Sequence, residues 1–116
     1  SRVVLKLPPA LSPVKAAILP LIRKGGLPEK AREIMDDLKF DYKCFYDEKD
    51  SIGKRYRRQD AIGTPFCITV DHQTMTDNTV TIRHRDSMEQ ERVAIDALSG
   101  IIGEQVSIKN LLKKLS

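Results

Sequence analysis

Four cationic side chains occur within five consecutive residues of this 116-residue chain: Lys54, Arg55, Arg57 and Arg58. Ser51 precedes them as a typical helix N-cap and Gly63 follows them, so we expect a helix over about residues 52–62. Cations at this spacing repel one another unless Asp60 or a bound polyanion offsets their charge. A cationic helix after a polar turn is suited to gripping nucleic-acid phosphates. A surface helix with paired charges is the alternative.

A second group of polar side chains lies in two strand-like stretches, residues 66–71 and 79–86. Apolar and polar residues alternate along both, so each strand has one apolar face for the core. The other face carries Thr69, Asp71, Thr79, Thr81, Arg83 and Arg85. Arginines bind phosphates or base edges, and hydroxyl and carboxylate groups add hydrogen bonds, so this face suits nucleotides. An ordinary exposed face with surface arginines is the alternative, and alternation alone does not separate the two.

Catalytic and metal-binding patterns are poorly developed in this sequence. His72 and His84 are the two histidines, and neither has the spacing of a metal ligand. The glycines form no nucleotide-binding loop. Cys44 and Cys67 lie in strand-like stretches without Cys-x-x-Cys spacing, so we expect buried, reduced thiols in an intracellular protein. No residue is therefore predicted to be catalytic or to bind a metal.

Strands and helices alternate in the first half of the chain. A continuous apolar run at residues 14–22 predicts a buried strand, and residues 42–46 predict a second one. Between them, apolar residues at helical spacing predict a helix: Ala31, Ile34, Met35 and Leu38. A strand, a helix and a strand in this order form a right-handed crossover with parallel strands. Residues 47–50 are expected to be an acidic, exposed turn.

The second half is expected to complete a mixed sheet. Strands at residues 66–71 and 79–86 are joined by a short loop closed by Asp77 and Asn78, so they must be antiparallel, and residues 90–95 predict a fifth strand. Asp96 is expected to cap one helix and Ser107 a last one. The predicted fold is α/β, with a sheet of about five strands and helices on both faces. The net charge of +4 indicates a mildly basic domain.

Residues 51–66, 69–71 and 79–90 closely resemble the C-terminal anticodon-binding domain of glycyl-tRNA synthetase, of the homodimeric class II kind. The run Arg-x-Arg-Asp-Ser-Met-x-Gln that begins at Arg83 is specific to the glycyl branch. The resemblance covers about residues 3–98. It implies a three-layer α/β/α fold whose mixed five-stranded sheet has the order 2-1-3-4-5, with strand 4 antiparallel. Residues 1–10 would then be a linker from a catalytic domain, and residues 11–116 the anticodon-binding domain.

The resemblance also implies a function. The family attaches glycine to its tRNA using ATP with magnesium, but the catalytic motifs are absent here, so this part is expected to be inert and to need no cofactor itself. Its implied partners are glycine tRNA, whose anticodon has cytosine at its second and third letters, and the catalytic domain of the same chain. The parent enzyme is expected to be a cytoplasmic homodimer without membrane contact, and the isolated domain a monomer.

Site residues follow from combining the resemblance with the chemistry of cytosine. Arginines would meet its O2 and N3 acceptors, and a carboxylate would accept from its N4 amine. The expected base readers are Arg55, Arg83 and Arg85, with Asp71 or Asp86 as acceptor, and the expected phosphate binders are Lys54, Arg57 and Arg58. The family pattern is not kept everywhere, since it differs at Ala61, His72, Gln73 and His84. The same fold used as a protein-interaction module remains the alternative function.

Overall fold

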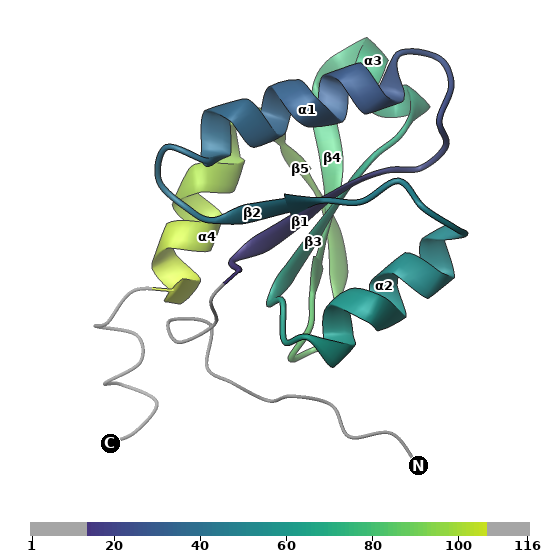
Figure 1. The fold of residues 1–116 in the computed structure, drawn as a ribbon. Helices are drawn as coiled ribbons and strands as arrows, with labels where there is room; N and C mark the ends of the chain where they lie inside the picture. The colour runs from purple at the N-terminus through teal and green to yellow at the C-terminus, as the bar shows by residue number, and fades with distance from the viewer. Residues whose placement is uncertain (1–13, 107–116) are drawn as a thin grey trace, which may run out of the picture.

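Five strands form the centre of the fold: β1 Ala16–Pro20, β2 Cys44–Tyr46, β3 Phe66–Val70, β4 Thr79–His84 and β5 Gln90–Ala94. The computed structural model, which describes residues 14–106, joins them in one sheet of order β2-β1-β3-β4-β5 (Figure 1). β1 is parallel to β2 and β3, whereas β4 is antiparallel to β3 and β5. The expected mixed sheet and its strand order are therefore confirmed.

Helices lie on the two faces of this sheet: α1 Leu27–Leu38, α2 Ile52–Ala61, α3 His72–Asp77 and α4 Leu98–Val106. α1 and α4 lie on one side of the sheet and α2 on the other (Figure 1). The larger core cluster joins residues of α1 and α4 to Ile18, Phe66 and Ile82. A smaller cluster beneath α2 contains Ala17, Leu19 and Cys67, against which Ile52 and Tyr56 pack.

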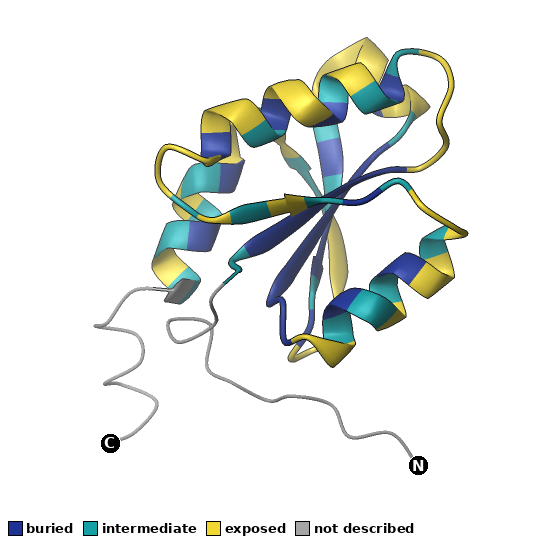
Figure 2. Ribbon diagram, in the orientation of Figure 1, coloured by how far each residue is buried: buried dark blue, intermediate teal, exposed yellow. Residues whose placement is uncertain are grey.

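The smaller cluster explains the burial pattern of the sheet. β1 and β3 are buried at every residue because α1 covers one of their faces and α2 the other (Figure 2). β4 alternates at its start, with Val80 and Ile82 buried and Thr79 and Thr81 partly exposed. β5 is exposed or partly exposed throughout. The polar face of β4 and β5 therefore extends beyond the part of the sheet that α2 covers.

Three expectations about local structure were wrong. The stretch after β3 is not a loop but the short helix α3, whose N-cap Asp71 forms a capping box with Thr74 and whose C-cap Asn78 is left-handed. Asp96 is not a helix cap but lies inside a short 3-10 helix, Ile95–Ala97. Asp47, in the turn expected to be exposed, is buried.

Two expected features lie outside the described residues: the linker at residues 1–10 and the last helix beginning at Ser107. Across residues 14–106, no helix has the length and apolar character needed to cross a membrane.

Candidate nucleic-acid interface

The helix α2 points its cationic residues in three different directions. Ser51 caps it by accepting a hydrogen bond from the Lys54 backbone N–H at 3.4 Å. At 100° per residue, Arg55 falls on the inward stripe with Ile52 and Tyr56. Lys54 and Arg57 are exposed, and neither forms an ion pair with any residue in the described range. Only part of the cationic cluster is therefore available to a ligand.

Arg55 is the buried member of this cluster. Only 2% of its surface is exposed, and its guanidinium donates to backbone carbonyls: Nη1 to Pro20 and Asp47, and Nη2 to Leu21 at 3.1 Å. Burial is the main influence on its pKa, which is lowered. Because these carbonyls belong to the end of β1 and to the loop after β2, Arg55 joins two loops and does not face solvent.

Arg58 is held on the other side of α2 by the acidic turn. Its Nε lies 3.2 Å from Asp47 Oδ2 and its Nη2 lies 3.3 Å from Asp50 Oδ2. Asp47 is buried between these two arginines: its carboxylate pairs with Arg58, and its backbone carbonyl accepts a hydrogen bond from Arg55. These contacts offset much of the repulsion between the closely spaced cations of α2.

Arg83 lies on β4 beneath the flank of α2. It donates to both carboxylate oxygens of Asp60, at 2.9 and 3.1 Å, and lies 5.0 Å from the centroid of the Tyr56 ring. The hydrogen bonds with Asp60 raise its pKa, so it stays charged. The Tyr56 hydroxyl in turn hydrogen-bonds Thr69 Oγ1 at 2.6 Å. Arg83 is 7% exposed and Thr69 5% exposed, so two members of the expected polar surface are covered by α2.

Arg92 is a residue of this face that the sequence interpretation missed. It lies on β5 opposite Thr81 and donates to both carboxylate oxygens of Asp71, at 2.7 and 2.8 Å. It also donates to Thr79 Oγ1 at 2.8 Å. The bond from Arg92 is the main cause that lowers the pKa of Asp71 to about 2. The alternation of β5 predicts this placement once its register with β4 is known.

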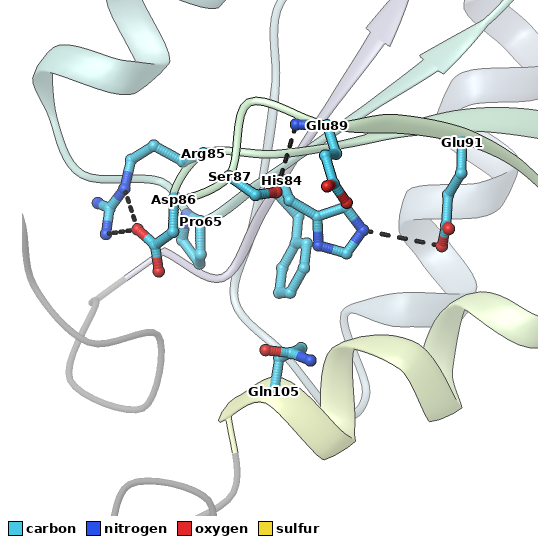
Figure 3. Close-up of a pocket in the computed structure, with 9 residues that line it drawn as sticks. Pro65, His84, Arg85, Asp86, Ser87, Glu89, Glu91 and Gln105 are labelled. Carbon is cyan, nitrogen blue, oxygen red and sulfur yellow. Dashed lines mark hydrogen bonds and ion pairs between the residues drawn. The ribbon is translucent and has the colours of Figure 1, made fainter. Parts of the chain in front are cut away.

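Arg85 and Asp86 directly follow β4 and make contacts other than those of Arg83. Arg85 Nη2 donates to Asp86 Oδ1 at 3.1 Å; Arg85 is buried, whereas 55% of the Asp86 side chain is exposed. They border a cavity of about 380 Å³ in which His84 points toward Glu91, at 3.8 Å (Figure 3). The structure thus separates the expected base readers into distinct places and does not form one cluster of them.

The surface that remains for a ligand combines α2 with the open part of the sheet. Arg57 is exposed on α2 three residues before Asp60, which binds Arg83, and Thr81 on β4 is partly exposed. Exposed cations, hydroxyls and a carboxylate on one face can bind phosphates and base edges. Within residues 14–106, no group of three or more histidine, cysteine or acidic side chains is arranged to hold a metal ion.

The relatives found by comparison with known proteins include several glycine–tRNA ligases. The chain is 58% identical over 96 residues to a glycine–tRNA ligase of Rhodopirellula baltica, covering 83% of this chain and 18% of the relative. It is 50% identical over 105 residues to a glycine–tRNA ligase of Borrelia hermsii, covering 90% of this chain and 24% of the relative. The chain therefore spans about a fifth to a quarter of the length of these relatives.

The fold is also found in a solved structure. The RNA binding domain of threonyl-tRNA synthetase from Cryptosporidium parvum superposes with a TM-score of 0.78 at 24% identity, covering 86% of this chain and 25% of that one. The family described as "Anticodon binding domain" matches residues 15–105, which include every strand and helix named above except the last residue of α4. The chain belongs to the anticodon binding domain family.

Proposed function

We propose that this chain is the anticodon-binding part of a glycine–tRNA ligase and binds the tRNA that accepts glycine. The observation that carries the proposal is its 50–58% identity, over most of its length, to ligases named for glycine. The match to the anticodon binding domain family over residues 15–105 supports the same role. The exposed cations of α2 beside a polar sheet face supply the chemistry that RNA binding needs.

We propose different roles for the exposed and the buried candidate residues. Lys54 and Arg57 are exposed and available to RNA phosphates, and the exposed carboxylate of Asp86 is available to the N4 amine of a cytosine. Arg55 and Arg83 are buried with their donors directed to protein atoms, so we propose that they position the interface. Arg58 and Asp71 act in the same way through their ion pairs. Arg85 orients Asp86.

The proposal extends to the parent protein. Its relatives are ligases several times longer than this chain, so we propose that a catalytic domain of the same chain uses ATP with magnesium to charge the tRNA. The parent enzyme is proposed to be a cytoplasmic homodimer. This chain contributes recognition of the anticodon, and the chemistry takes place elsewhere.

Fluorescence anisotropy with a labelled anticodon stem-loop tests the proposal. The full 116-residue chain is expected to bind a stem-loop with a glycine anticodon more tightly than one in which both cytosines are replaced. Arg57→Ala should weaken binding, whereas Lys39→Ala, which removes an exposed charge from the C-cap of α1, a helix on the other side of the sheet, should not. Equal affinity for both stem-loops would refute the proposed recognition.

A further inference from the structure

A second hollow lies beside α2, outside the sheet face described above. It has a volume of about 420 Å³ and is formed by the loop after β1 and the loop after β2. Leu21, Ile22, Arg23 and Lys24 line it from the first loop, and Ser51 lines it from the second. In open α/β sheets, the carboxyl ends of parallel strands are the usual place for ligands. This hollow lies at the carboxyl end of β1.

The wall contributed by the loop after β1 is partly apolar. Leu21 is 38% exposed and Ile22 42% exposed, although they are the first two residues after a fully buried strand. Exposed branched side chains on a loop give an apolar surface against which a nucleobase can pack. Arg23 and Lys24, which come next, are exposed as well. Two apolar residues are thus followed directly by two cationic ones on one wall.

The charges around this hollow are not balanced. The two acids that line it, Glu48 and Asp50, already have partners: Glu48 accepts from the Tyr46 hydroxyl at 2.7 Å, and Asp50 pairs with Arg58. Arg23 and Lys24 make no ion pair within the part of the chain that the structure describes. The mouth of the hollow is therefore suited to an anionic ligand.

Arg55 fixes the shape of this hollow from below. Its donors to Pro20 and Leu21 hold the end of β1, and its donor to Asp47 holds the other loop. Arg55 Nε is buried and has no hydrogen-bond partner in the structure, and Arg55 is itself one of the lining residues. A cation buried among backbone carbonyls adds positive potential to the floor of the hollow.

We propose that this hollow binds one nucleotide of the RNA loop, with its base against Leu21 and Ile22 and its phosphate on Arg23 and Lys24. The inference rests on the proposed function, because RNA is the polyanion that function supplies. It adds a second contact, near the start of α2, to the one on the open sheet face. A single-stranded loop is the required form, since only an unpaired base can turn out and pack on side chains.

Photo-crosslinking tests this placement directly. The full chain carrying p-benzoylphenylalanine in place of Ile22 is irradiated with the glycine anticodon stem-loop, and the crosslinked nucleotide is mapped. We expect a crosslink to a loop nucleotide. The control carries the same amino acid in place of Phe40, which is 83% exposed just after α1, and should give none. No crosslink from position 22, or one to the paired stem only, would overturn the proposal.

A charge variant tests the phosphate contact. Arg23→Ser with Lys24→Ser should weaken binding about 5- to 20-fold and make the log–log salt slope shallower by about 1. The control, Lys39→Ser with Lys43→Ser, removes the same charge from exposed positions that do not line the hollow. If both double variants weaken binding equally, the effect is general electrostatics and the hollow is not a site.

The outcomes separate this inference from the function on which it rests. If the wild-type chain distinguishes anticodons but the position-22 crosslink is absent, the hollow is refuted and the proposed function stands. If the crosslink forms but the anticodon has no influence on affinity, the hollow binds RNA and the proposed function fails. Millimolar ATP should leave the crosslink unchanged. Its loss would identify a mononucleotide site and overturn the assignment to an RNA loop.

Discussion

Arg92 and Asp71 form a two-pronged ion pair that ties β5 to the turn between β3 and α3. The guanidinium reaches both carboxylate oxygens, at 2.7 and 2.8 Å, while one of those oxygens also accepts the Thr74 backbone N–H as the cap of α3. The same side chain therefore starts a helix and anchors the outermost strand of the sheet. Removing the charge of Asp71 should therefore weaken both the cap of α3 and the contact with β5.

Acid should weaken this contact. The pKa of Asp71 is lowered to about 2 in the folded chain, chiefly by Arg92, and is about 3.9 in an unfolded one. A lowered folded pKa stabilises the fold above the unfolded value, and that stabilisation is lost as the pH falls toward 2. Asp71→Asn, which keeps a cap acceptor, should cost about 1–2 kcal/mol at pH 7, about half as much near pH 3 and much less near pH 2. Urea unfolding at several pH values measures this difference.

The exposed pair of Asp36 and Lys39 provides the control. Asp36→Asn should change the free energy of unfolding by less than about 0.5 kcal/mol at either pH. An equal loss in both variants would mean that the effect reflects net charge and not the Asp71 contact.

Arg83 and Asp60 should be strongly coupled in stability. Their side chains are 8% and 16% exposed, so removing one partner leaves the other charge poorly solvated. Asp60→Asn and Arg83→Met should each cost about 2–4 kcal/mol. The double variant should cost clearly less than the sum, because no unpaired charge remains. A double-mutant cycle from urea unfolding tests the coupling, and strictly additive losses would contradict it.

The apolar pattern of the sequence was sufficient to predict the strands and the α/β class of the fold. Buried residues run without a break through β1 and β3, as expected for strands covered on both faces. The helix α3 was not predicted from the sequence, because His72–Asp77 contains no apolar stripe. Its capping box also pairs Asp71 with Thr74, where Glu or Gln is the usual partner. The strand order came from the resemblance and not from the pattern.

The candidate site was harder to predict because partners from other elements decide which arginines are free. Ile52, Arg55, Tyr56 and Gln59 share one helical stripe, and Arg55 and Gln59 were recognisable as inward only after α2 was docked. The role of Arg55 depends on carbonyls of two loops distant in sequence. Arg92 needed the register of β4 with β5. Charge clusters in sequence therefore overstate the number of cations that a ligand meets.

The two cysteines should differ in reactivity. Burial raises the pKa of Cys67 to about 12 and that of Cys44 to about 11, so the reactive thiolate is scarce in both at pH 8. Cys67 is 1% exposed beneath α2, whereas Cys44 is half-buried on the edge strand β2. Titration with Ellman's reagent should modify Cys44 slowly and Cys67 only after unfolding. Rapid modification of both thiols in the folded chain would contradict the packing of α2.

RNA affinity should depend on salt and on two exposed side chains in different ways. With about 3 to 5 phosphate contacts, the log–log salt slope for the anticodon stem-loop should be roughly −2 to −3.5. Lys54→Ala removes a phosphate contact, so it should weaken binding to every stem-loop alike and make the slope shallower by about 0.7.

Asp86→Asn should instead change selectivity. Its exposed carboxylate, oriented by Arg85, is the proposed acceptor for a cytosine N4 amine, and an amide can turn its NH₂ group toward that position and repel it. Binding to the glycine stem-loop should weaken by about 1–3 kcal/mol, whereas a stem-loop lacking the cytosine should bind as before. Anisotropy titrations at matched salt measure both. A uniform loss would place Asp86 among the residues that shape the interface, because only a base contact loses affinity selectively.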